Sequence, residues 1–210
     1  MRQKRIALVM ISAGIAIGIV AGPAAAEPQK LDCSTFPAES SHESLVKTLG
    51  KDNVVTESIP GAEGQDTETT IVYPKDRTKR LAIFWKDEEA KKGIGAILLR
   101  QDDKADPVGW KVGGLDITST LADVEKLNGK PFKITGFGWD YGGYSGGWDG
   151  GKLETMLGAK CTVSLRFTLP DDAKPEVAKK VSGENQFPSN GAAMKAAKPR
   201  LSEITVGYPE

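Results

Sequence analysis

The sequence predicts an α+β fold in which an antiparallel sheet carries a few short helices on one side. Two short amphipathic segments have the start and stop signals of helices, and each is followed by a longer stretch of strand-like sequence. The clearest strand is residues 161–169, where apolar and polar side chains alternate without interruption. The order helix, strands, helix, strands favours an antiparallel sheet with its helices gathered on one face.

The first expected helix begins at a capping box. Ser40 can accept a hydrogen bond from the backbone of the first turn while Glu43 reaches back toward it, and Gly50 supplies a stop. The apolar stripe of this helix is Leu45, Val46 and Leu49. Spacing of this kind predicts one amphipathic helix at the start of the first run of strands.

A second helix of the same design is expected between Thr120 and Gly129, with Thr120 and Asp123 in the capping positions. Its apolar stripe is Leu121, Val124 and Leu127. The strand-like stretches are 53–58, 69–73, 80–86 and 94–100 after the first helix, and 132–140, 161–169 and 201–207 after the second. We therefore expect one mature domain, with residues 40–113 and 114–210 as two helix-then-meander repeats.

Two resemblances follow from these residues. The recurring capped helix, Gly-Lys turn and meander resembles the tandem repeats of β-lactamase inhibitor proteins and of small outer-membrane assembly lipoproteins. The motif Leu127-Asn128-Gly129-Lys130-Pro131-Phe132, with the later Gly136-Phe137-Gly138-Trp139-Asp140-Tyr141-Gly142-Gly143, resembles a family of uncharacterised bacterial secreted proteins. The second resemblance implies no known activity, so it assigns no catalytic residue.

The N-terminus has the pattern of a signal peptide. Basic Arg2, Lys4 and Arg5 precede an uncharged apolar run over 6–20, and the small residues 24–26 follow a Gly-Pro pair. We expect cleavage after residue 26, which leaves a mature domain of residues 27–210 in the periplasm or outside the cell. No later stretch is apolar for long enough to cross a bilayer, so no membrane span is expected after cleavage.

Charge narrows the range of partners. The full chain has 28 basic and 28 acidic residues. Removal of the signal peptide takes away the basic residues Arg2, Lys4 and Arg5 and no acidic residue. The mature chain is therefore mildly acidic and has no basic tract, so a nucleic-acid partner is not expected.

The two cysteines, Cys33 and Cys161, are an even pair in a chain expected to reach an oxidising compartment. A disulfide between them is the simplest interpretation. It would lower the entropy of the unfolded chain and stabilise the fold by about 4–5 kcal/mol in the entropic account. A redox-active pair is disfavoured because the cysteines lack the Cys-x-x-Cys spacing that lowers a thiol pKa.

Residues 136–151, GFGWDYGGYSGGWDGG, are the most distinctive part of the chain, because nearly all of them are glycine or aromatic. One interpretation is structural: a bulged strand and a Gly-rich hairpin whose rings cover a sheet edge. The other is a binding surface with a stacking platform and hydrogen-bonding carboxylates. The residues of the binding hypothesis are Trp139, Asp140, Tyr141, Tyr144, Trp148 and Asp149.

The leading functional hypothesis is non-enzymatic binding of a protein, peptide or glycan of the cell envelope through this aromatic surface. The first alternative is an enzyme that acts on cell-wall or other carbohydrate through carboxylates, with Asp140, Asp149 and Glu154 as candidates. The second alternative is a purely structural envelope protein whose aromatic segment is core. Of the rings of Trp139, Tyr141, Tyr144 and Trp148, at least two are expected to be accessible to solvent and to form one contiguous patch.

Other chemistries lack their residues. A Gly-x-Ser-x-Gly motif at 143–147 has no histidine after it to accept a proton, since the only histidine is His42, expected on the surface at a helix start. One histidine and a bonded cysteine pair do not make a zinc site, and no cofactor motif is complete. Toward the C-terminus, residues 170–199 are polar, with one short helix expected over 175–181.

Overall fold

The computed structural model describes residues 28–100, 109–158 and 161–208. The expected signal peptide and its cleavage site lie outside these residues. The helices are α1 (His42–Leu49), α2 (Leu121–Asn128), α3 (Pro175–Ala178) and α4 (Ala192–Ala197), with single 3₁₀ turns at Lys51–Asn53, Ala62–Gly64, Lys152–Glu154 and Lys179–Val181. The strands are β1 (Gln29–Lys30), β2 (Val54–Pro60), β3 (Asp66–Val72), β4 (Leu81–Asp87), β5 (Lys92–Arg100), β6 (Trp110–Lys111), β7 (Lys133–Thr135), β8 (Thr162–Thr168), β9 (Gln186–Pro188) and β10 (Arg200–Gly207).

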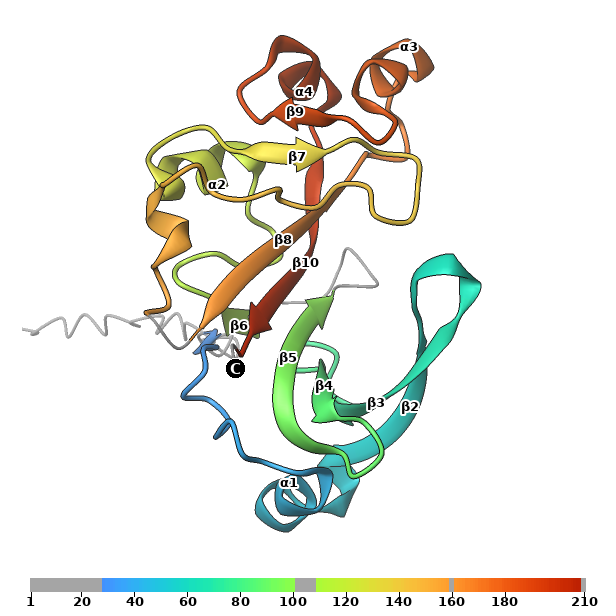
Figure 1. Ribbon diagram of the computed structural model, residues 1–210, viewed down its shortest axis with the longest axis vertical. Coiled ribbons are helices and arrows are strands. Elements are labelled where there is room, and N and C mark those ends of the chain that lie inside the picture. Colours follow the sequence, from blue (N-terminus) through green and yellow to red (C-terminus); the bar gives the residue numbers. More distant parts are fainter. Residues whose placement is uncertain (1–27, 101–108, 159–160, 209–210) are drawn as a thin grey trace, which may run out of the picture.

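The main sheet has six antiparallel strands in the order β2-β3-β4-β5-β10-β8. Strands β2 to β5 form a meander, and the last strand of the chain, β10, inserts between β5 and β8 (Figure 1). Two small pairs, β1 with β6 and β7 with β9, accompany it. The expected α+β fold with an antiparallel sheet is confirmed.

The two faces of the sheet differ in what covers them. Side chains along β10 point alternately to the two faces. Ile204 and Val206 lie in the main hydrophobic core on one face, whereas Glu203 and Thr205 lie on the other. The main core also contains the buried side chains of α1, α2 and α4, so these helices lie on one side of the sheet. On the opposite face a small cluster of apolar side chains remains, consisting of Ile71, Ala82 and Leu98. We call this opposite side the open face.

Both expected helices form, and both have capping boxes. In α2, Thr120 accepts from the backbone N–H of Asp123, and Gly129 ends the helix in the left-handed region at φ 79°. In α1 the box is one residue later than expected, because Ser41 and Ser44 form it. Ser40 is instead buried, and its carbonyl accepts a hydrogen bond from Gly93 at the start of β5.

The second run of strands is less regular than the first. The strand expected over 132–140 ends at Thr135, and the chain then turns through 136–142. The polar C-terminal stretch contains the expected short helix at Pro175–Ala178, and also α4, which was not expected. Each half begins with a capped helix, and β5 of the first half pairs with β10, the last strand of the second half. That the halves are repeats of one unit stays a prediction.

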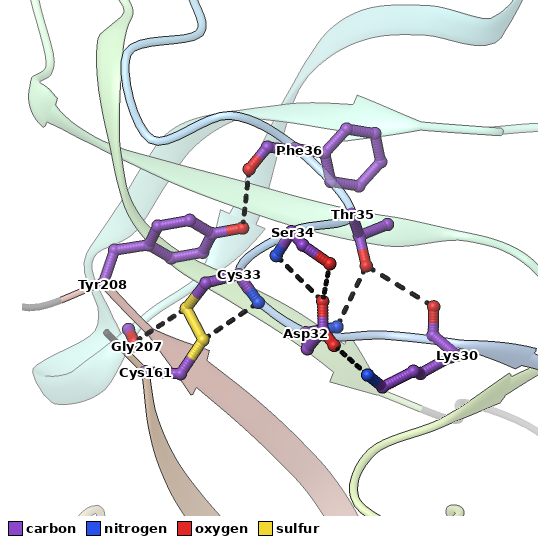
Figure 2. Close-up of a disulfide and its surroundings, with 9 residues drawn as sticks. All are labelled: Lys30, Asp32, Cys33, Ser34, Thr35, Phe36, Cys161, Gly207 and Tyr208. Carbon is purple, nitrogen blue, oxygen red and sulfur yellow. Dashed lines mark hydrogen bonds and ion pairs between the residues drawn. A yellow bond between two sulfur atoms is a disulfide. The ribbon is translucent and has the colours of Figure 1, made fainter. Parts of the chain in front are cut away.

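A disulfide joins Cys33 to Cys161, with Cα atoms 5.8 Å apart and 128 positions of sequence between them (Figure 2). Asp32 shapes the turn around it by accepting hydrogen bonds from the backbone N–H and the hydroxyl of Ser34. The hydrogen bond from Lys30 and those from Ser34 lower the pKa of Asp32 to about 2. The bridge therefore ties the N-terminal segment to the start of β8.

The helices of the described residues are all short. None of them has the length and apolar character needed to cross a bilayer.

Candidate binding site

The Gly-rich aromatic segment forms part of the sheet structure. Residues 143–146 lie between β7 and β8: Thr135 of β7 donates its backbone N–H to the carbonyl of Tyr144, and Ser145 donates to the carbonyl of Leu165 in β8. Gly143 is required at this place, because it has φ 82° and a Cβ here would lie 2.0 Å from the carbonyl oxygen of Phe167. The segment is therefore held by backbone pairing on both sides.

Trp148 belongs to the core, which corrects its expected place in an exposed platform. Its side chain is 7% exposed, its ring packs 5.1 Å from that of Phe132, and its indole N–H donates to the carbonyl of Val163. The buried side chain of Asn128, at the end of α2, donates to the carbonyl of Trp148 and holds the turn that follows. For this ring the structural interpretation of the segment is right.

The other three rings lie near the open face. Tyr141 is 47% exposed, and its ring meets that of Trp139 edge-on, with centroids 5.5 Å apart. Tyr144 is half-buried, with the guanidinium of Arg166 lying 4.8 Å from the centre of its ring. Trp139 donates its indole N–H to the carbonyl of Gly136, which fixes the ring beside Tyr141. These residues lie in a turn and not in the strand that the sequence predicts.

The tip of the β2–β3 hairpin reaches this turn. The backbone N–H of Glu63 donates to the carboxylate of Asp140 at 3.0 Å, and the hydroxyl of Tyr141 donates to the Glu63 carboxylate at 3.4 Å. In Figure 1 the hairpin curves up from the α1 end of the molecule beside the sheet. Two segments that are far apart in the sequence thus meet at Asp140 and Tyr141.

Three charged side chains from neighbouring strands interact with one another on the open face. Glu203 of β10 accepts hydrogen bonds from Arg100 of β5 at 2.9 Å and, more distantly, from Arg166 of β8 at 3.5 Å. Arg166 also donates to the backbone carbonyls of Asp140 and Gly142, which holds the turn against the sheet. Burial raises the pKa of the neighbouring Tyr144 hydroxyl above its ordinary value, and the charge of Glu203 raises it further.

These residues surround a groove of about 290 Å³, which we call the open-face groove. Its lining consists of Ile59, Pro60, Gly61, Thr67, Phe84, Leu98, Arg100, Asp140, Tyr141, Tyr144, Arg166 and Thr205. Polar and apolar atoms contribute about equally to its surface, with the guanidinium groups of Arg100 and Arg166 and the carboxylate of Asp140 among aromatic and aliphatic side chains. Sites of this composition bind small molecules or single units of larger ones.

Asp149 has different surroundings from Asp140. It lies in a left-handed turn at φ 50°, and its carbonyl accepts from the ammonium group of Lys130, just after α2. Glu154 lies in the 3₁₀ turn that follows. The structure thus places Asp140 against the β2–β3 hairpin and the other two carboxylates beside α2, and it does not join them in a shared cleft.

The side chain of His42, expected on the surface, is partly buried and contacts the sheet. Its Nδ1 lies 2.9 Å from the hydroxyl of Thr70, which also accepts the indole N–H of Trp85. The Thr70 hydroxyl thus joins the imidazole of His42 to the buried indole of Trp85. Burial lowers the pKa of His42, and the charge of Lys91 lowers it further.

The sequence did not indicate Arg100 and Arg166, which line the groove, or Glu203, which accepts hydrogen bonds from both of them. Alternation in β8 does place Arg166 opposite the apolar face, but no local signal shows that Arg100 and Glu203 are its neighbours across the sheet. Among the described residues, no group of three or more His, Cys, Asp and Glu side chains has a geometry that could hold a metal ion.

Comparisons with protein-family models, curated proteins and solved structures found no match to this chain. The resemblances drawn from the sequence therefore stay predictions.

Proposed function

We propose that this protein is an exported, non-enzymatic binding protein whose open-face groove takes one unit of a cell-envelope glycan. The observation that carries the proposal is the exposed ring of Tyr141, held at the groove by Trp139 on one side and by Glu63 on the other. An aromatic face suits the C–H surface of a sugar ring, and here it stands beside both donors and acceptors for hydroxyl groups.

The groove supports a binding function because its walls are held in place before any ligand arrives. Its floor is formed by paired strands, Arg166 fixes the turn that carries Tyr141, and the hairpin tip is bonded to Asp140. A preorganised site loses little conformational entropy when it binds. At about 290 Å³ the groove is at the small end of ligand sites, which fits a single sugar unit of a longer chain.

The groove's charges favour a glycan over a strongly acidic or basic peptide. Two guanidinium groups, from Arg100 and Arg166, are balanced by the carboxylates of Glu203 and Asp140. A site with donors and acceptors but little net charge suits hydroxyl and amide groups.

The test is a binding panel of soluble N-acetylglucosamine oligomers and short peptides, measured by calorimetry. Tyr141→Ala should weaken glycan binding by about tenfold, equivalent to about 1.4 kcal/mol, whereas Tyr141→Phe should retain most of it because the ring remains. Asp140→Asn and Asp149→Asn are a matched pair from two Gly-Trp-Asp sequences, and only the first should alter binding. Equal effects of the pair, or binding confined to peptides, would overturn the proposal.

A further inference from the structure

A second and larger cleft lies on another part of the molecule, away from the aromatic segment. It has a volume of about 930 Å³ and is bordered by the start of α2, by α4, and by the ends of β8 and β10 nearest to them. Its apolar lining includes Ile117, Leu121, Met194 and Leu201, all of which belong to the main core. The cleft therefore opens onto the hydrophobic interior and has the size of a site for a drug-sized ligand.

Basic side chains border this cleft. Lys195, Lys198 and Arg200 line it and are exposed, and within the described parts of the chain none of them takes part in an ion pair. Two acidic side chains also line the cleft, and one of these, Glu125, accepts a hydrogen bond from the hydroxyl of Ser189 at 2.6 Å. The lining therefore carries one more positive charge than negative charge.

The start of α2 does not account for this positive character. The backbone N–H groups of Thr120 and Asp123 are used within the capping box, where the two residues bond reciprocally, and the carboxylate of Asp123 places a negative charge there. The side chains of α4 and β10 therefore supply the charge that a ligand would meet.

We propose that this cleft binds a small amphipathic anion, specifically a free fatty acid with one carboxylate and one alkyl chain. The alkyl chain would lie over the apolar floor around Leu121 and Met194, and the carboxylate would lie among Lys195, Lys198 and Arg200. A single excess positive charge matches a carboxylate better than a doubly charged phosphate monoester. The proposal is independent of the open-face groove.

The probe is dodecanoate below its micelle concentration, observed through methionine methyl resonances. Met194 lines the cleft, whereas Met156 lies against Gly113 and serves as an internal reference. Dodecanoate should shift the Met194 methyl signal and leave that of Met156 unchanged. Shortening the chain by two methylenes to decanoate should weaken binding by about fifteenfold, because each buried methylene contributes about fourfold in affinity.

Two alanines provide a matched pair of variants. Ala122 lines the cleft on the exposed side of α2, whereas Ala196 is exposed on α4 but does not line it. Ala122→Trp should fill the cleft and weaken dodecanoate binding at least tenfold, while Ala196→Trp should leave it unchanged. Lys198→Gln with Arg200→Gln should also weaken it, and Lys126→Gln, on α2 outside the cleft, should not.

Three outcomes would overturn the proposal. The first is that dodecyltrimethylammonium, which has the same tail and the opposite charge, binds as tightly as dodecanoate. The second is that dodecyl phosphate binds more tightly than dodecanoate. The third is that Ala122→Trp does not weaken the binding of dodecanoate. Tyr141→Ala should not change the binding of dodecanoate. A failure of the glycan proposal for the open-face groove can therefore be distinguished from a failure of the proposal for this cleft.

Discussion

At the scale of single residues, the two tryptophans of the repeated Gly-Trp-Asp sequence have different roles. Trp148 packs against Phe132 in the core, whereas Trp139 is partly exposed beside Tyr141. We expect Trp148→Ala to lower the free energy of unfolding by about 3–5 kcal/mol and Trp139→Ala to lower it by less than half as much. Urea unfolding of the two variants measures this, and equal losses would contradict the predicted difference between the two rings.

His42 provides a pH-dependent contribution that can be isolated, since it is the only histidine in the chain. Its pKa in the folded state is lower than the unfolded value of 6.5, so the unfolded chain binds the proton more tightly. Its stabilising contribution is present above pH 6.5 and is lost as the pH falls toward the folded pKa. Wild type should therefore lose more stability than His42→Gln between pH 7.5 and 5.5, as measured by urea unfolding. Parallel losses in the two proteins would contradict this.

At the scale of elements, the disulfide determines whether the N-terminal segment stays on the fold. The segment's backbone pairs with β6 through only two strand residues, Gln29 and Lys30, and Cys33 anchors it beyond that point. Replacing both Cys33 and Cys161 by serine should lower stability by up to about 4–5 kcal/mol. Hydrogen exchange should also become faster in residues 29–36, with less change in β4 and β5. Unaltered protection in that segment would show that its packing alone holds it.

Elements also show where sequence reasoning succeeds. Thr120, Asp123 and Gly129 mark both ends of α2 because caps are local features, and Pro175 marks the start of α3 for the same reason. The strand expected through Trp139 ends at Thr135, and the next residue, Gly136, packs against Gly183, where a Cβ would lie 2.3 Å from the carbonyl oxygen. That contact joins distant parts of the chain, so no local pattern predicts it.

At the scale of the whole molecule, the groove depends on the order of strands in the sheet. Arg100 and Glu203 are brought together because β10 pairs with β5, and Asp140 meets Glu63 because the β2–β3 hairpin bends toward the aromatic turn. The sequence indicates the aromatic residues as candidates, and strand order selects Tyr141 and Tyr144 as groove residues while placing Trp148 in the core.

The most direct test of the open-face groove uses the four tyrosines of the chain as reporters. Tyr141 and Tyr144 line the groove, whereas Tyr208 is buried with its hydroxyl donating to Phe36, and Tyr73 lies outside the groove lining. In a protein labelled at the tyrosine rings, titration with N-acetylglucosamine oligomers should shift the signals of Tyr141 and Tyr144 and leave the other two unchanged. Shifts confined to Tyr73 or Tyr208, or none at millimolar ligand, would contradict the assignment of the groove as the binding site.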